Sequence, residues 1–242
     1  MQMRVDVMTN VPFETQIIVA VEVTPSVRAI RFTQPRGFEY AAGQFVILSL
    51  DSEKGAVNKP LSLSSSPTEQ HLEVAKRLTG HEFSNAFLSL KKDDKIRFTG
   101  PYGNFTFKGE HRKVAMLSGG IGITPLLSMI RYCTDMDIDT EIVLFYSNRQ
   151  EDDIPFRDEL DRLMARNRRL TVVHTLTRPG TAWKGKTGRI NAQMIKENIS
   201  NPGEWVYYSS GPAKMVEAMI SLLKEMNIDA RQIKKEYFPG YD

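Results

Sequence analysis

The feature that most constrains this chain is a glycine cluster between an apolar segment and an amphipathic one. Residues 114–117 are apolar, Gly119, Gly120 and Gly122 follow, and residues 125–136 have the apolar spacing of a helix. Glycines in such a turn permit φ > 0 and remove Cβ atoms that would hold an anion away from the backbone. The first N–H groups of the helix then face that anion. The pattern indicates a phosphate cradle, although a tight turn without a ligand has similar spacing.

Length and composition allow one large domain or two modest ones. The chain has 242 residues, of which 41% are hydrophobic and 25% charged. Its 32 basic residues nearly match its 29 acidic ones and are scattered, so nothing argues for a nucleic-acid partner. The start lacks a signal-peptide pattern, and the longest apolar run, residues 17–21, is far shorter than the roughly 20 residues of a membrane span. We expect a cytoplasmic protein without a membrane span.

Cysteine and histidine usage argues against a metal centre. Cys133 is the only cysteine, which excludes an intrachain disulfide, a zinc ribbon and a cysteine-held iron–sulfur cluster on this chain. Because Cys133 lies among apolar residues of a predicted helix, we expect it to be buried rather than catalytic. The histidines are isolated, without the i, i+4 pairing of a metal site. The sequence therefore predicts no bound metal.

The first part of the chain has the periodicity of short strands. Up to Phe107, six segments of alternating polarity are separated by turn residues, which is typical of an antiparallel barrel. A helix is expected among them over residues 84–90, with Ser84 as its N-cap. The expected strands are residues 14–23, 27–32, 44–50, 61–64, 71–77 and 94–98.

After Lys113 strands alternate with helices, which predicts a parallel sheet flanked by helices. We therefore predict an N-terminal six-stranded antiparallel β-barrel over residues 1–108 and a C-terminal α/β domain with a parallel sheet over residues 112–242. The expected strands of the second domain are residues 114–117, 141–146, 170–175 and 204–209, and its expected helices are residues 125–136, 154–165, 191–198 and 213–226.

Ligands of an α/β sheet bind at the carboxyl ends of its strands, so the residues after each predicted strand are candidate ligands. Ser147 and Arg149 follow the second strand, where a guanidinium can bind an adenosine ribose or its 2′-phosphate. Alternatively, Arg149 pairs with Glu151 or Asp152 on the surface. The last strand ends in Ser210-Gly211-Pro212, where the next helix begins.

The order of these motifs resembles the ferredoxin–NADP reductase superfamily, the flavin- and nicotinamide-dependent oxidoreductases, over nearly the whole chain. Each motif is weak alone, but all stand in the family's order. The matching stretches are Lys59-Pro60-Leu61-Ser62 for Arg-x-Tyr-Ser, residues 79–84 for a glycine-bearing phosphate turn, 100–105 for Gly-Pro-x-Gly-x-Phe, 119–125 for Gly-Gly-x-Gly-Ile-Thr-Pro, 148–149 with 157–160 for Asn-Arg…Arg-Asp-Glu-Leu, 210–212 for a Cys-Gly-Pro-like element, and 236–241 for the carboxy-terminal Glu-x-Phe-x-Gly-Tyr.

The resemblance implies that the barrel binds FAD. Lys59 is then on the flavin phosphate and Ser62 at the N5 and O4 edge of the ring, with Pro60 and Leu61 between them. Contacts to the FAD pyrophosphate are assigned in the same way to Thr79, Gly80 and Ser84.

The resemblance also implies that the second domain holds the nicotinamide dinucleotide, with Ser210 beside the ring. Phe238 is expected to cover the flavin face, and Glu236 to relay a proton toward N5 or to hold the tail in place. The implied catalytic residues are therefore Ser62, Ser210, Glu236 and Phe238. The remaining dinucleotide contacts are assigned to Gly119, Gly120, Gly122, Thr124, Pro125, Ser147, Arg149, Gly211 and Pro212.

Three positions depart from the family pattern. Lys59 replaces an arginine and loses the planar two-pronged donor. Leu61 replaces a tyrosine and offers no aromatic face, and Ser210 replaces a cysteine. We expect looser flavin binding and slower, but retained, hydride transfer.

By resemblance, the chain is an NAD(P)H-dependent reductase that passes single electrons from FAD to a separate acceptor. That acceptor is a protein such as ferredoxin, or a small quinone, dye or ferric chelate. Because no carboxylate stands between Tyr146 and Gln150, NADPH is favoured over NADH, with Arg178 as a second cation.

Two alternatives remain for the function. One is a flavin-binding electron-transfer subunit of a larger complex, which the lack of a C-terminal cysteine cluster disfavours. The other is a flavin-free nucleotide-binding regulatory module, which is motivated by Lys59 and Leu61.

Overall fold

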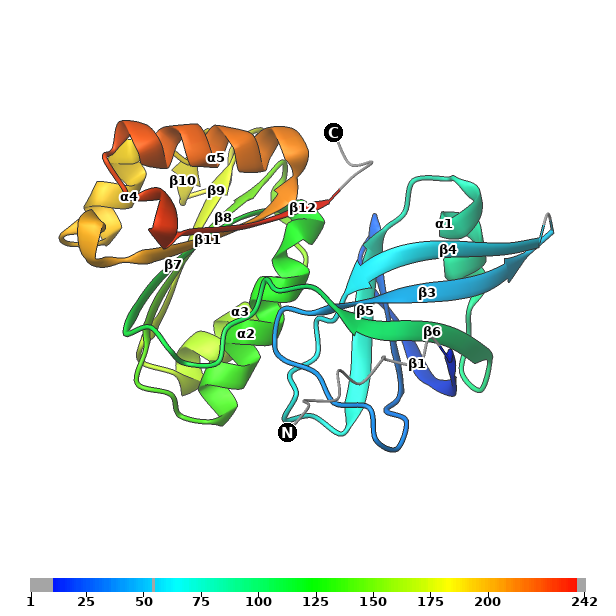
Figure 1. Ribbon diagram of the computed structural model, residues 1–242. Helices are drawn as coiled ribbons and strands as arrows, with labels where there is room; N and C mark the ends of the chain where they lie inside the picture. The colour runs from blue at the N-terminus through cyan, green and yellow to red at the C-terminus, as the bar shows by residue number, and fades with distance from the viewer. Residues whose placement is uncertain (1–10, 54, 239–242) are drawn as a thin grey trace, which may run out of the picture.

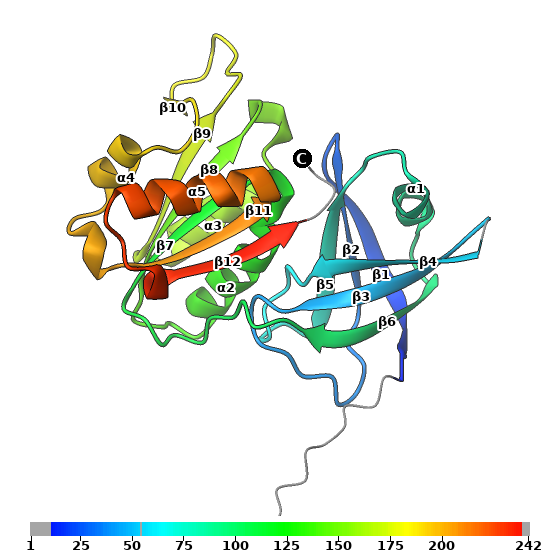
Figure 2. The ribbon, with the colours of Figure 1, turned by 45° about the horizontal axis from the view of Figure 1, so that its top comes forward.

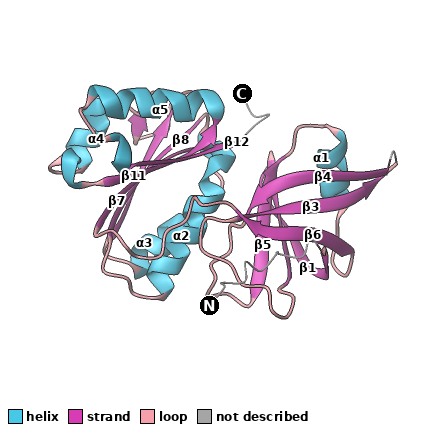
Figure 3. Ribbon diagram, viewed as in Figure 1, coloured by secondary structure: helices cyan, strands magenta, loops and turns pink. Residues whose placement is uncertain are grey.

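The computed structural model describes residues 11–53 and 55–238, which form two sheets side by side (Figure 1). The sheet from the first half of the chain is antiparallel, and the sheet from the second half is parallel with helices on both faces (Figure 3). Each sheet has six strands among the described residues. The predicted fold class of both halves is confirmed.

The N-terminal sheet closes into a barrel. Its order is β4-β3-β6-β1-β2-β5, and a bridge between Leu63 and Val74 joins the chain after β4 to β5, so that the outer strands meet. Apolar side chains from all six strands, such as Phe32 and Phe98, fill its interior. The strands are β1 (Phe13–Thr24), β2 (Val27–Thr33), β3 (Phe45–Ser52), β4 (Gly55–Ser62), β5 (His71–Arg77) and β6 (Lys95–Tyr102), and the helix is α1 (Glu82–Ser89).

Two expectations for the barrel were wrong in position. The fourth strand runs from Gly55 to Ser62, not over 61–64, because a strand that pairs only with β3 tolerates Pro60 and the polar residues before it. Ser84 is not the N-cap of the helix. The cap is His81, and the buried Ser84 hydroxyl, inside the first turn, accepts the Thr79 N–H at 2.9 Å instead.

The C-terminal sheet has the order β10-β9-β8-β7-β11-β12, with every described pair parallel. Of its strands, β10 and β12 were not predicted, because β10 is very short and β12 carries charged residues as an outer strand. The elements are β7 (Lys113–Gly119), β8 (Glu141–Asn148), β9 (Leu170–Leu176), β10 (Lys186–Thr187), β11 (Val206–Pro212), β12 (Ile233–Phe238), α2 (Ile123–Asp135), α3 (Arg157–Arg166), α4 (Ala192–Asn198) and α5 (Ala213–Glu225).

Successive residues of the central strands point to opposite faces of this sheet. Val114 and Met116 pack with α2 and α3, whereas Ala115 and Leu117 pack with α4 and α5. Figure 2 shows the two pairs of helices on the two faces. Because both faces of these strands are buried, successive residues along them are apolar without alternation.

The two halves share one apolar contact region. Ala29 and Ala75 of the barrel belong to the same buried cluster as Leu127 and Ile130 of α2. The connector between β6 and β7 spans residues 103–112. The boundary between the two predicted domains, 1–108 and 112–242, lies in this connector. No helix in the described ranges is long and apolar enough to cross a membrane.

The turn before α2 lies against the end of β11. A Cβ added to Gly122 would lie 2.4 Å from the Gly211 Cα atom and 2.5 Å from the Ser210 carbonyl oxygen. We therefore expect Gly122→Ala to lower the free energy of unfolding by about 1–3 kcal/mol, measured by urea denaturation.

The matched control for this substitution is Gly203→Ala. A Cβ at Gly203 has no other atom within 4 Å. If the two variants had equal free energies of unfolding, the two backbones at Gly122 and Gly211 could move apart without loss of stability, which would contradict the prediction.

Candidate functional site

The predicted phosphate cradle is a short 3-10 turn, Gly120–Gly122, between β7 and α2. Of its glycines, only Gly120 has a positive φ, +54°, and the nearest atom to an added Cβ there is Arg77 Nη2 at 3.7 Å. Gly122 makes the close contact with Gly211, and its contact with a ligand stays a prediction. The expectation that these glycines permit φ > 0 is thus confirmed at Gly120 alone, since Gly119 and Gly122 have negative φ. Their contact with an anion stays a prediction.

Side chains beneath the cradle hold its shape. The Tyr146 hydroxyl donates to the Gly120 carbonyl at 2.8 Å, and the Thr124 hydroxyl donates to the Ile121 carbonyl at 3.2 Å. Thr124 and Pro125 are buried in α2, which begins at Ile123, two residues earlier than predicted. The side chain of Thr124 therefore acts on the turn, and its contact with a ligand stays a prediction.

The barrel and the parallel sheet meet where β4, β11 and β12 end. Ser62 of β4 donates its hydroxyl to Glu236 Oε2 of β12 at 3.3 Å, and Glu236 is paired with Ser210 of β11. The Ser210 hydroxyl is fully buried and has no hydrogen-bond partner among the described residues. The structure thus brings together three of the four predicted catalytic residues, which lie far apart in the sequence.

Glu236 is half-buried in this corner, and its charge is costly there. Burial raises the pKa of its carboxyl to about 7, although the Ser62 hydrogen bond lowers it in part. A carboxyl with such a pKa gains and loses a proton near neutral pH. The carboxyl of Glu236 can therefore hold or release one proton in this corner.

Phe238 ends β12, beside Pro212 of β11, and is half-buried on the apolar cluster of α2. Leu61 is buried among the apolar residues of the barrel core. Their expected flavin contacts stay predictions. The last part of the carboxy-terminal motif, residues 239–241, lies outside the described residues.

The predicted phosphate-binding residues of the barrel lie on β4, before α1 and, for the buried Ser84, in the first turn of α1. Thr79 and Gly80 are exposed, and an added Cβ at Gly80 would have no other atom within 4 Å. Near Lys59, the structure places a cation that the sequence did not single out, Lys76, which is 1% exposed. Burial lowers the pKa of Lys76 to about 8, and the charge of Lys59 acts in the same direction. An anion between these two lysines would relieve their repulsion.

Sequence reasoning also missed Arg77, at the end of β5. Its Nη1 atom pairs with Asp153 Oδ2 of the second half at 2.8 Å, and its Nη2 atom lies over Gly120. The only local signal was two adjacent basic residues at the end of a predicted strand. Its partner Asp153 lies far away in the sequence, so no spacing rule could reveal the pair.

The predicted ribose-binding residues lie at the end of β8. Arg149 is exposed and its side chain makes no described hydrogen bond or ion pair, since Glu151 pairs with Arg157 at 2.7 Å instead. The Arg149 carbonyl accepts the Arg178 N–H at 2.9 Å, which places the two arginines side by side. The alternative in which Arg149 pairs with Glu151 or Asp152 is not seen among the described contacts.

Among the described residues, no group of three or more His, Cys, Asp or Glu side chains is placed to hold a metal ion. Cys133 is 1% exposed, and burial raises the pKa of its thiol to about 12. Its predicted buried role is confirmed.

Comparison with known proteins identifies the class. A family described as oxidoreductase FAD-binding domain matches residues 14–107, and one described as oxidoreductase NAD-binding domain matches residues 116–220. These matches define a two-domain oxidoreductase with FAD and a nicotinamide dinucleotide as cofactors.

Whole proteins of this class are also similar to the chain. It is 30% identical to ferredoxin–NADP reductase B of Sorangium cellulosum, over 89% of this chain and 91% of that protein. It is 27% identical to the ferredoxin–NAD(P)(+) reductase component of the naphthalene 1,2-dioxygenase system of Pseudomonas putida, over 92% of this chain and 68% of that protein. The chain belongs to the ferredoxin–NADP reductase family.

Solved structures support the same fold. A ferredoxin NADP+ reductase from Neisseria gonorrhoeae, with bound FAD and NADP, superposes with a TM-score of 0.81 over 93% of this chain and 97% of that chain, at 22% identity.

The described residues fit the two cofactors. Above Gly120 the nearest group is the Arg77 guanidinium, a cation that suits a pyrophosphate, and the space at Gly80 before α1 is open. The Ser210 hydroxyl is buried without a partner among the described residues, beside the corner of Ser62 and Glu236. A ring bound at this corner would lie next to the Glu236 carboxyl, whose pKa is near neutral.

The raised pKa of Glu236 predicts a pH dependence of stability. The folded state retains the proton better than the unfolded state, so this contribution to stability is complete below pH 4.5 and is lost as the pH rises to about 7. We expect Glu236→Gln to remove that loss, so that the variant gains stability relative to the parent between pH 5 and pH 8.

Urea unfolding of the parent and of Glu236→Gln at pH 5 and at pH 8 measures this difference in stability. The control is Glu217→Gln, since Glu217 is exposed. A parent and a Glu236→Gln variant with parallel pH profiles would contradict the prediction.

Proposed function

We propose that this NAD(P)H-dependent flavoprotein reductase transfers electrons through FAD to a separate one-electron acceptor, a ferredoxin or an oxygenase component. The observation that carries the proposal is the corner where Ser62 of the barrel meets Glu236 and Ser210 of the parallel sheet. When bound, FAD accepts a hydride from the nicotinamide and releases its electrons singly. The known relatives named above act with ferredoxin.

The protein's own residues supply position and one proton path. The Gly120 turn and Arg77 hold the dinucleotide pyrophosphate, and Lys59, Lys76 and the Thr79-Gly80 turn hold that of FAD. Ser62 orients the flavin edge, and Glu236 exchanges a proton through the Ser62 hydroxyl. Ser210 and Gly211 would lie beside a bound nicotinamide, and Phe238, which ends β12 next to Pro212, would have to move aside for it.

The test is the visible spectrum of the purified protein followed by reduction with NADPH and NADH. We expect one FAD per chain. We also expect the protein, supplied with NADPH or NADH, to reduce ferricyanide or a ferredoxin. A protein that takes up neither FAD nor FMN would contradict the proposal. The protein could instead reduce ferricyanide but neither a ferredoxin nor an oxygenase component. That result would favour the alternative of an electron-transfer subunit of a larger complex.

We further propose that NADPH is the preferred donor, because the exposed Arg149 and its neighbour Arg178 offer two cations beside Ser147. We expect Arg149→Ala to raise the KM for NADPH at least tenfold, which corresponds to about 1.4 kcal/mol, and to change the KM for NADH little. Steady-state kinetics with both nucleotides measures the effect. Equal changes would show that Arg149 does not determine the specificity.

A further inference from the structure

The chain contains a buried arginine that none of the predicted contacts uses. Arg131 lies on α2, the helix that begins at the phosphate cradle, and it is 4% exposed. One side of its guanidinium faces its own half of the molecule: Nε and Nη2 donate to the two carboxylate oxygens of Glu159 on α3, at 2.5 and 2.8 Å. This bidentate contact fixes the plane of the group.

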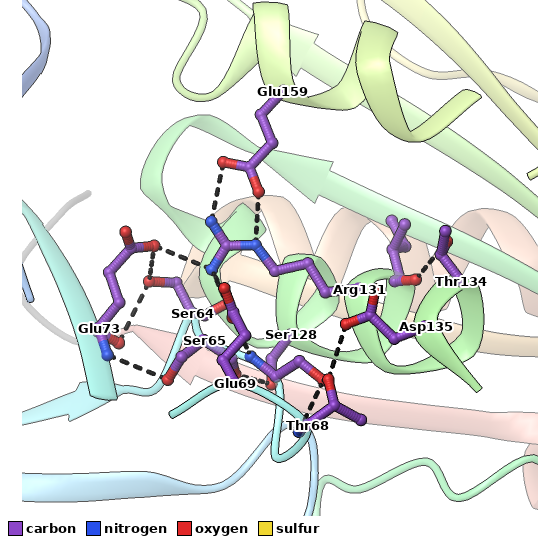
Figure 4. A network of polar contacts seen from close by, with 12 residues as sticks. Ser64, Ser65, Thr68, Glu69, Glu73, Ser128, Arg131, Thr134, Asp135 and Glu159 are labelled. Atoms are coloured by element: carbon purple, nitrogen blue, oxygen red, sulfur yellow. Dashed lines mark hydrogen bonds and ion pairs between the residues drawn. The ribbon is translucent and has the colours of Figure 1, made fainter. Parts of the chain in front are cut away.

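The third nitrogen of Arg131 faces the barrel. Nη1 donates to the Ser64 carbonyl at 2.7 Å and to Glu73 Oε1 of β5 at 3.0 Å (Figure 4). Glu69 Oε2 lies 3.5 Å from the same nitrogen. A single side chain thus contacts the barrel and the second half of the molecule at once.

The barrel segment that Arg131 contacts begins directly after the flavin corner. Ser64 is two residues after Ser62, and its N–H and hydroxyl bond to Glu73, at 2.8 Å to the carbonyl and 2.9 Å to Oε1. One turn before Arg131 on α2, the Ser128 hydroxyl donates to the Ser65 carbonyl at 2.5 Å. Helix α2 therefore holds this segment at Ser64 and Ser65, and its last residue, Asp135, accepts the Thr68 hydroxyl at 2.7 Å as a third contact (Figure 4).

The charges of this contact are matched inside the protein. Glu73 is 1% exposed, and its Oε2 atom also accepts a hydrogen bond from Arg31 Nε at 2.7 Å. Although burial alone would raise its pKa, Arg131 and Arg31 hold it below the usual range. A buried charge of this kind needs its partners in place, which gives the contact one defined geometry.

We propose that Arg131, with Ser128, is a positioning residue that sets the distance between the nucleotide cradle at the start of α2 and the flavin corner at Ser62. The inference rests on the proposed transfer of hydride from nicotinamide to flavin, because a small error in the separation of the reacting atoms lowers the rate of that step without changing the groups that bind either cofactor.

The test variants are Arg131→Lys, which keeps the charge and loses the planar fork, and Ser128→Ala, which removes only one hydroxyl. The control is Arg169→Lys, since Arg169 is exposed and pairs with Asp137 and Asp139 of its own half. Hydrogen–deuterium exchange of residues 62–69 in the flavin-loaded proteins reports on the attachment, independently of activity. We expect faster exchange in both test variants and an unchanged rate in the control.

Stopped-flow reduction of the flavin supplies the second readout. We expect the rate at saturating nucleotide to fall at least tenfold in Arg131→Lys and by less in Ser128→Ala, while the nucleotide dissociation constant stays within twofold. Parental rates and parental exchange in both variants would overturn the inference, as would a loss expressed only in the dissociation constant. If Arg131→Lys does not fold, Ser128→Ala decides alone.

The parent protein separates the two proposals. If NADPH and NADH both fail to reduce its flavin, the proposed function fails, whatever the exchange data show. If the parent is reduced and the variants match it, only the positioning role fails.

Discussion

The contact between Gly122 and Gly211 determines where the other parts of the site lie. The two backbones approach so closely that even the Cβ of an alanine at Gly122 would lie about 2.4 Å from the Gly211 Cα atom. This contact places the end of β11, with Ser210, against the turn that begins α2. Because β12 pairs in parallel with β11, Glu236 then reaches Ser62 of the barrel. A site of three segments is thereby assembled around one close approach of two backbone segments.

Charge contributes the second constraint, between the halves of the molecule. Apolar residues of β2, β5 and α2 provide the area of contact, but apolar surfaces slide without a defined register. The ion pairs of Arg131 with Glu73 and of Arg77 with Asp153 have directions and lengths, and they lie on either side of that area. These two ion pairs therefore fix the orientation of the halves, while the apolar residues supply most of the contact area.

Much of the fold could be predicted from periodicity, because the central strands and long helices bury whole faces. The misplaced or missed elements, β4, β10 and β12, are outer strands in the strand orders of the described residues, where each pairs along its length with one neighbour only and polar residues are tolerated. Site residues within one motif, such as Gly120 and Ser62, could be named from the sequence. Lys76, Arg77 and Arg131 could not, since their relevance arises from partners that only the folded chain brings near.

The burial of Cys133 has a practical consequence for studies of this protein. A thiol with a pKa of about 12, shielded on α2, is almost entirely protonated at neutral pH and reacts slowly with alkylating reagents or oxidants. The natural chain therefore offers thiol chemistry no reactive position among its described residues. Single cysteines placed on the barrel and on the parallel-sheet half would carry fluorescent or spin labels without a competing background, which makes the separation of the halves directly measurable in solution.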